Sequence, residues 1–385
     1  MMEAARRQTH RGGAVMPPPG SARTTSLGYR RLGEIVSLTL IRPDDWHVHL
    51  RDGAMLHAVL PDTARRFARA IVMPNLKTPV RTVAEAHAYR ERILAARPAG
   101  SGFEPLMTLY LTDNTTPAEI ERARSSAHVH AVKYYPAGAT THSDSGVTDV
   151  ERCYDTLAAM EAVGLPLLVH GEVTDSLVDV FDREAVFVAR VLERIVTRFP
   201  RLKVVLEHVT TEEGVAFVRA APATVAATLT AHHLLLNRNA MFRGGLRPHA
   251  YCLPVLKRER HRAALVEAAI SGSPKFFLGT DSAPHARATK EAACGCAGLY
   301  TAHAGIELYA EVFKAAGVLE RLEAFASLHG PAFYGLAPNR DRITLIEAPW
   351  PVPPAIDLAA VGIGDSLIPF RAGETVAFRI EGVDA

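Results

Sequence analysis

The feature that most constrains this chain is a regular alternation of short apolar runs with longer amphipathic stretches, beginning near Ser37. Residues 70–73, 166–169, 203–206 and 275–278 are four of these runs. Because they are apolar on both faces, they are typical of parallel strands buried on both sides of a sheet. Eight candidate strands follow one another in this way. They end near His47, Met73, Tyr110, Lys133, His170, His208, Leu229 and Thr280.

Helical patterns separate these strands. Thr82 and Glu85 have the spacing of a capping box, which predicts a helix that runs to about Ala96. Residues 150–163, 182–199, 211–220 and 258–271 also show helical patterns. Eight strands alternating with helices favour a (β/α)8 barrel over a doubly wound sheet. The chain has no G-x-G-x-x-G or P-loop pattern, so dinucleotide and nucleoside-triphosphate binding lack their usual motifs.

Charge and cysteine content exclude several classes of protein. The chain has 43 Lys and Arg against 41 Asp and Glu, a net charge of +2. This balance gives no strong positive field, so we expect neither a nucleic-acid nor a membrane partner. Four cysteines in 385 residues do not form a disulfide framework, which favours a cytoplasmic location. Histidine is frequent, at 17 residues, and this invites a metal hypothesis.

The two ends of the chain differ from its body. Residues 1–31 hold six arginines, a single acid and a Pro-Pro-Pro-Gly stretch. We therefore predict a disordered extension over residues 1–36 and one barrel domain over residues 37–385. The last part of that domain, residues 341–385, is rich in proline and has short apolar runs. We expect it to pack as strands beside the barrel.

Candidate metal ligands stand where the predicted strands end. His47 and His49 are two residues apart, so their side chains project from the same face of a strand. His170, His208 and Asp281 each follow a later apolar run. The carboxyl ends of barrel strands converge on one face, so these side chains are expected to meet there. Four imidazoles and a carboxylate suit two zinc ions about 3.5–4 Å apart, bridged by a hydroxide, better than one catalytic ion.

Lys133 ends the fourth predicted strand and would face the same centre. A protonated lysine there would be repelled by two metal ions. A lysine with a depressed pKa can instead react with carbon dioxide to give a carbamate, an anion whose two oxygens can bridge two metals. A lysine that pairs with an acid inside the barrel is the simpler alternative.

Five segments of the chain together resemble one family, the dihydroorotases of the amidohydrolase superfamily. The similarity extends from about Leu40 to Val376 and is greatest to the compact bacterial type, which is a homodimer. The matching segments are residues 45–53 (DWHVHLRDG), 71–76 (IVMPNL), 133–137 (KYYPA), 168–173 (LVHGEV) and 279–285 (GTDSAPH).

The resemblance implies both the ligands and the reaction. One zinc ion would be held by His47, His49 and Asp281 and the other by His170 and His208, with Lys133 bridging them as a carbamate (N6-carboxylysine). Asp281 would also move the proton during interconversion of L-dihydroorotate and N-carbamoyl-L-aspartate, a step of pyrimidine biosynthesis. The residues implied to bind substrate are Arg51, Asn75 and His285 at its carboxylate, backbone groups near Leu253 and Ala297 at the ring edge, and Thr140 and Thr141 on a mobile loop.

Two alternatives stay open at this point. One is another cyclic amidohydrolase, such as a hydantoinase or allantoinase. Arg51, Asn75 and His285 together argue against it, because they suit a ring that bears a carboxylate and a hydantoin has none. The other is a metal-free scaffold homologue, which the intact ligand set disfavours. Several further residues are expected to be structural or solvent-facing. They are His128, His130, His232, His233, His249, Cys294 and Cys296.

Overall fold

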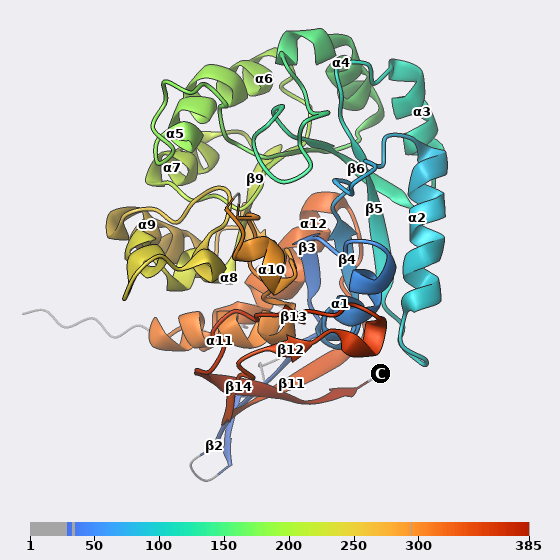
Figure 1. Cartoon of the computed structure of the whole chain (residues 1–385). Coiled ribbons are helices and arrows are strands. Elements are labelled where there is room, and N and C mark those ends of the chain that lie inside the picture. The colour runs from blue at the N-terminus through green and yellow to red at the C-terminus, as the bar shows by residue number, and fades with distance from the viewer. Residues whose placement is uncertain (1–28, 33–34, 294, 385) are drawn as a thin grey trace, which may run out of the picture.

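Eight parallel strands form the centre of the protein. The computed structural model describes residues 29–32, 35–293 and 295–384 (Figure 1). Neighbouring strands pair in chain order from β3 to β10, and all eight predicted strands are present, which confirms the (β/α)8 barrel. The strands are β3 (Asp44–Val48), β4 (Arg69–Val72), β5 (Glu104–Tyr110), β6 (Val129–Tyr134), β7 (Leu167–Val169), β8 (Val204–Leu206), β9 (Val225–Leu229) and β10 (Phe276–Leu278).

Helices follow the strands at the predicted places. The capping box at Thr82 is formed, with the side chains of Thr82 and Glu85 each accepting from the other residue's backbone N–H. The predicted helix over 182–199 is a continuous run of α5, the π-helical turn η2 and α6. The helices are α1 (Gly53–Arg66), α2 (Val83–Ala96), α3 (Pro117–Ser125), η1 (Val150–Cys153), α4 (Tyr154–Val163), α5 (Arg183–Phe187), η2 (Val188–Leu192), α6 (Glu193–Arg198), α7 (Glu212–Ala220), α8 (Ala231–Leu235), η3 (Arg238–Phe242), η4 (Pro248–Ala250), α9 (Glu259–Ile270), α10 (Arg287–Lys290), η5 (Ala302–Ala304), α11 (Gly305–Ala315), η6 (Leu319–Arg321), η7 (Ala324–Leu328), α12 (His329–Tyr334) and η8 (Ala359–Val361).

The barrel interior is filled at the end away from the carboxyl ends of the strands. Each strand contributes one buried apolar residue to this inner cluster, and α12 packs against it. Trp46 stacks on Tyr334 with 4.5 Å between ring centroids. Gly330 lies so close to Trp46 that an added Cβ would be 1.9 Å from the indole Nε1, so α12 requires glycine there. The inner cluster therefore leaves the carboxyl ends of the strands as the open face of the barrel.

The first and last barrel strands meet at that open face. The backbone N–H of Asp281 donates to the carbonyl oxygen of His47 at 2.8 Å, and that of His49 donates to Ser282 at 3.1 Å. Asp45 accepts from the N–H and hydroxyl of Thr280 at 2.9 and 2.6 Å. Barrel closure thus brings residues that are more than two hundred positions apart in the sequence into contact.

A separate antiparallel sheet contains segments from both ends of the described chain (Figure 1). Its order is β1 (Tyr29–Leu32), β2 (Ile35–Ile41), β11 (Arg342–Pro351) and β14 (Thr375–Asp384), and β12 (Ile356–Asp357) pairs with β13 (Ser366–Leu367) nearby. Strands from the C-terminal segment were expected. The boundary at residue 36 does not match an edge of the fold, because β1 and the start of β2 precede it. The remainder of the predicted extension, residues 1–28, lies outside the described residues.

No helix in the parts of the chain that the structure describes is both long and apolar enough to span a bilayer.

Candidate metal and substrate site

A cavity opens at the carboxyl ends of the barrel strands and gathers most of the residues singled out from the sequence. Lys133 and His285 do not line it. Lys133 lies over the ring of Tyr135 and His285 contacts Arg51, and these two partners do line the cavity. The lining residues are His47, His49, Arg51, Asn75, Tyr135, Thr140, Thr141, His170, His208, Leu253, Asp281, Ala283, Ala297 and Gly298.

Three side chains from the barrel seam converge on one point. Asp281 Oδ1 lies 3.0 Å from His49 Nε2 and 3.4 Å from His47 Nε2. Glu207 Oε2 lies 2.8 Å from the other ring nitrogen of His47, so Nδ1 is the donor and Nε2 carries a lone pair toward Asp281. A lone pair facing a carboxylate oxygen is unfavourable unless a cation lies between them. This donor set therefore fits a divalent metal ion.

His170 and His208 continue the cluster. The ring centroid of His208 is 5.0 Å from that of His47 and 4.9 Å from that of His170. His170 Nε2 lies 2.9 Å from Glu172 Oε2, which leaves its Nδ1 as the nitrogen free to bind an ion. His208 Nδ1 is buried without a hydrogen-bond partner.

Sequence reasoning missed Glu172 and Glu207, although each lies within two residues of a predicted ligand. Both carboxylates are buried, and each orients a histidine. Glu207 Oε2 also accepts from Thr228, whose hydroxyl in turn accepts from the backbone N–H of His208. The sequence signal that could have identified them is an acid within two residues of a histidine at the end of a strand.

Lys133 lies in β6 and is fully buried. Its Nζ has no hydrogen-bond partner, so it does not form the simple pair with an acid that was the alternative. Burial lowers the pKa of Lys133 to about 8, although Glu207 and Asp281 oppose this shift. Its charge lowers the pKa of both His170 and His208, which places the amine among the histidines. An amine that is partly neutral at physiological pH suits the formation of a carbamate.

The other ionisable groups are in the forms that metal ligands need. Burial lowers the pKa of His49 to about 3 and lowers those of His170 and His208, so these imidazoles are neutral. Burial alone would raise the pKa of Asp281, but the hydrogen bond from His49 holds it below its usual value. Asp281 is therefore a carboxylate at neutral pH.

Backbone strain collects at this cavity. Among the described residues, five other than glycine have a positive φ, and four of them lie at the site or on the loop beside it. Arg51, His208 and Asp281 have φ of 59°, 41° and 45°, and His142 has φ of 56°. Each such conformation costs on the order of 1–3 kcal/mol, and this kind of strain is found most often at functional sites.

The residues expected to hold a carboxylate form one network. A terminal nitrogen of Arg51 lies 2.9 Å from His285 Nε2, which is also 3.0 Å from the carbonyl oxygen of Ala297. Burial and the charge of Arg51 lower the pKa of His285 to about 2, so this imidazole is neutral. Asn75 donates to the backbone oxygen of Thr141 at 3.0 Å, which holds the loop over the cavity.

Lys290 fixes the backbone on the opposite wall of the cavity. Its Nζ donates to the carbonyl oxygens of Tyr251, Cys296 and Gly298 at 2.8, 2.8 and 2.7 Å. These carbonyls flank Leu253 and Ala297, the positions whose backbone is expected to meet the substrate ring. Sequence reasoning missed Lys290, because nothing in its local sequence distinguishes it from a surface lysine.

Comparison with known proteins identifies the family. A model of the amidohydrolase family matches residues 35–347. The dihydroorotase of Azoarcus sp. (strain BH72) is 68% identical over 347 residues, which cover 89% of this chain and 99% of that protein. The chain belongs to the dihydroorotases of the amidohydrolase family.

Solved structures of dihydroorotases agree with this assignment. The Campylobacter jejuni dihydroorotase is 35% identical, with a TM-score of 0.81 over 90% of this chain and 98% of that one. The dihydroorotase of Saccharomyces cerevisiae in complex with 5-fluoroorotic acid is 34% identical, with a TM-score of 0.82 and the same two coverages. The similarity thus covers nearly the full length of both solved chains.

Among the residues that the structure describes, two further groups have ligand atoms close enough to hold a metal. One is His232, His233 and Cys252, all buried, and the other is Glu212, Glu213 and His261 near the surface. Both ring nitrogens of His233 are already engaged, by the Thr230 hydroxyl and the Pro254 carbonyl. His232 and His233 are buried, as a structural role predicts, whereas Cys294 lies outside the described residues.

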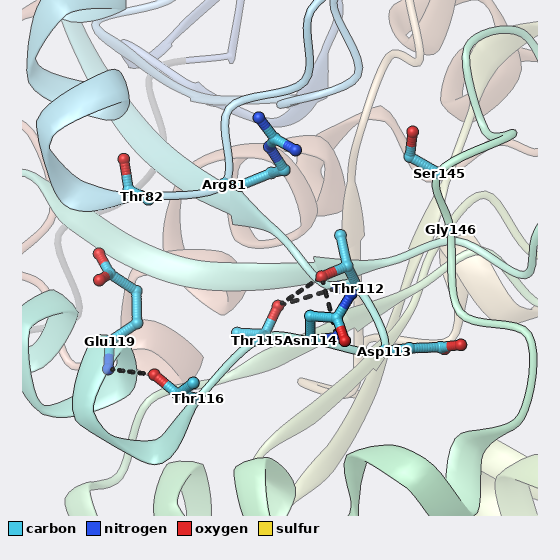
Figure 2. Close-up of a pocket in the computed structure, with 10 residues that line it drawn as sticks. All are labelled: Arg81, Thr82, Thr112, Asp113, Asn114, Thr115, Thr116, Glu119, Ser145 and Gly146. Carbon is cyan, nitrogen blue, oxygen red and sulfur yellow. Dashed lines mark hydrogen bonds between the residues drawn. The ribbon is translucent and has the colours of Figure 1, made fainter.

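A larger cavity lies away from the metal-ligand cluster, beyond the end of β5 (Figure 2). Its hydroxyl groups are occupied by local turns and caps: Thr115 and Thr112 contact each other at 3.2 Å, and Thr116 accepts from Glu119 N at 3.3 Å. The residues that line it are Arg81, Thr82, Thr112, Asp113, Asn114, Thr115, Thr116, Glu119, Ser145 and Gly146. Size alone therefore does not locate the site of chemistry in this dihydroorotase chain.

Proposed function

We propose that the protein interconverts L-dihydroorotate and N-carbamoyl-L-aspartate, closing the ring in the biosynthetic direction of pyrimidine synthesis. The observation that carries this proposal is the convergence of His47 and His49 on Asp281, with the unpartnered Nδ1 of His208 nearby, beside a buried lysine and an arginine network suited to a carboxylate. A cyclic amide that bears a carboxylate needs both halves of such a site. The dihydroorotase relatives support the same reaction.

The residues present fit a pair of metal ions, which we propose to be zinc. His47, His49 and Asp281 would hold one ion and His170 and His208 the other, with carboxylated Lys133 between them. When bound, the ions would supply Lewis acidity at the amide carbonyl and a hydroxide nucleophile at neutral pH. Lys133 Nζ forms its carbamate by adding to carbon dioxide and releasing one proton, which its lowered pKa favours.

Asp281 is proposed as the residue that moves the proton. In the hydrolytic direction the nucleophile adds to the ring carbonyl, and the bond from that carbon to the ring nitrogen breaks. Asp281 takes the proton of the nucleophile and delivers it to the departing nitrogen. Its low pKa keeps it ready as a base at neutral pH.

The substrate carboxylate would be bound by the network around Arg51. The guanidinium can offer two parallel N–H donors to a carboxylate, which fixes both the position and the orientation of the ring. Asn75 and His285 would complete this pocket. Backbone groups near Leu253 and Ala297 would meet the ring edge, and Thr140 and Thr141 would close over it and exclude water.

We also propose a homodimer in the cytoplasm, on the basis of the similarity to compact bacterial dihydroorotases and of the cysteine content. Light scattering coupled to size-exclusion chromatography tests the dimer, because a monomer of 41.7 kDa is readily separated from twice that mass.

An assay of dihydroorotate ring opening, monitored as the loss of ultraviolet absorbance, tests the reaction. We expect activity that disappears on chelation and returns with zinc. Hydantoin and allantoin are assayed in parallel, and faster turnover of either one would contradict the proposed substrate. A pure protein that retains no metal after zinc loading would instead favour the scaffold alternative.

A further inference from the structure

Tyr135 is the one residue with a polar side chain in the lining of the cavity that the resemblance leaves without a role. It follows β6 and is 1% exposed, yet its hydroxyl has no hydrogen-bond partner. Other buried tyrosines differ: the Tyr110 hydroxyl lies 3.3 Å from the carbonyl oxygen of His142, and that of Tyr309 contacts two carbonyls. Among the tyrosine side chains that the structure describes, Tyr135 and Tyr334 alone have buried hydroxyls without partners.

An unpaired buried hydroxyl is unfavourable by about 1–3 kcal/mol, and phenylalanine would avoid that cost. The ring of Tyr135 is held firmly, with its centroid 5.2 Å from the stacked ring of Tyr110 and 6.0 Å from that of His170. Packing therefore accounts for the ring but not for the hydroxyl. Unsatisfied groups of this kind are rare in native proteins and call for a functional explanation.

The hydroxyl can act only as a neutral hydrogen-bond donor or acceptor. A tyrosine hydroxyl has an ordinary pKa of about 10, so the phenol keeps its proton at neutral pH. Lys133 Nζ is 4.9 Å from the ring centroid, and no acceptor in the protein takes the proton of the hydroxyl. An oxygen atom of a molecule bound in the cavity can therefore accept it.

The position of the Tyr135 ring indicates which end of the bound molecule lies beside it. Tyr135 lies beside Lys133 and His170, which belong to the proposed metal centre. The carboxylate pocket is instead built around Arg51 and His285. The ring is therefore next to the proposed metal centre, where the amide carbonyl reacts.

We propose that Tyr135 is a further catalytic residue whose hydroxyl donates a hydrogen bond to the oxygen of the amide carbonyl under attack. This bond strengthens as that oxygen gains negative charge, so it lowers the barrier more than it tightens substrate binding. The proton stays on the phenol throughout. The inference rests on the proposed dihydroorotase reaction, and it adds a donor to the chemistry set out above.

The test is Tyr135→Phe in the full chain loaded with zinc, with ring opening and thermal unfolding measured on the same preparation. We expect kcat to fall about 10- to 100-fold and KM to change less than about threefold, since the lost donor acts chiefly in the transition state. The unfolding midpoint should stay equal or rise, because no hydrogen bond of the folded protein is removed.

Tyr334→Phe is the matched control. It removes the other unpartnered buried hydroxyl, which lies on α12 at the closed end of the barrel, and should leave kcat and KM unchanged.

Three results would overturn the role of Tyr135 while leaving the reaction intact. They are an unchanged kcat in Tyr135→Phe, a raised KM with normal kcat, and a fall in kcat that accompanies a lowered unfolding midpoint. Wild-type protein that fails to open dihydroorotate would overturn the proposed reaction and, with it, this role.

Discussion

Two buried ion pairs of the barrel wall differ from the cavity in how their polar groups are satisfied. In the wall, Arg66 donates to both carboxylate oxygens of Glu307 at 2.9 Å, and Asp44 accepts two bonds from Arg69. At the cavity, atoms of equal burial have no partner in the protein. They are Lys133 Nζ, Glu172 Oε1, Glu207 Oε1, His208 Nδ1, Tyr135 Oη and Asn75 Oδ1.

The backbone repeats this contrast. Positive φ values outside glycine concentrate at the cavity and its loop, with Arg371 the exception among the described residues. Free groups and strained backbone both cost stability, and the paired wall compensates for them. The difference teaches that the two regions can be altered separately: changes at the cavity should affect turnover, and changes in the wall should affect stability.

The sharpest test of this separation at the cavity is Asp281→Asn. Asparagine tolerates the positive φ of this position, so the fold should survive while the base is lost. We expect kcat to fall about 10³- to 10⁴-fold, as removal of a general base predicts. Steady-state kinetics and circular dichroism measure the two effects, and near-normal turnover would eliminate Asp281 as the proton carrier.

The complementary test in the wall is Arg66→Met. It leaves Glu307 buried without its partner, which should lower the free energy of unfolding by about 3–5 kcal/mol. Urea unfolding measures this loss, and kcat of the folded enzyme should stay at the wild-type value. The double variant Arg66→Met, Glu307→Leu should recover most of the stability, since no unpaired charge remains. A large loss of kcat in Arg66→Met would contradict the separation of the two regions.

Arg51→Lys is expected to have a smaller effect, confined to binding. Lysine keeps the charge but loses the planar pair of donors, so KM for dihydroorotate should rise about 10- to 100-fold with kcat within about threefold. Arg92, which pairs with Asp52 on the surface, provides the control Arg92→Lys, with unchanged KM. If KM were normal in Arg51→Lys, the carboxylate would have to bind elsewhere.

The smallest effect is expected at an exposed pair on α9. A hydrogen bond from Arg262, with a second from Asn237, lowers the pKa of Glu259 from 4.5 to about 2. The pair therefore stabilises the fold above about pH 4.5, and this contribution is lost as the pH falls toward 2. Because Glu259 is largely exposed, Glu259→Gln should cost under about 1 kcal/mol at pH 7. Urea unfolding at several pH values measures this loss of free energy. A larger loss would show that exposed ion pairs also contribute substantially to stability.

The parts of this molecule that follow from local sequence were predictable. Most barrel strands are apolar runs, and the spacing of His47 and His49 needs only strand geometry to indicate that they could bind one ion. Asp281 was identified because it follows such a run, and its contact with His49 requires only that the barrel close.

The parts that depend on pairing between distant segments were not predictable. Glu207 orients His47 from another strand, and Lys290 binds carbonyls of two loops, which no local pattern encodes. The pairing of β2 with β11, with Ile41 opposite Arg342, likewise joins distant segments and has no signal in the local sequence. The unpaired hydroxyl of Tyr135 is likewise a property of the folded cavity.

The pairing of β2 with β11 also sets an order of events during synthesis. The ribosome synthesises Ile35–Ile41 long before Arg342–Pro351. The apolar strand β2 therefore lacks its partner β11 while the barrel segments are being translated. Exposed strand edges of this kind are the segments that aggregate in nascent chains. The small sheet therefore cannot be completed until its C-terminal strands have been synthesised, and β2 lacks its partner β11 during that interval.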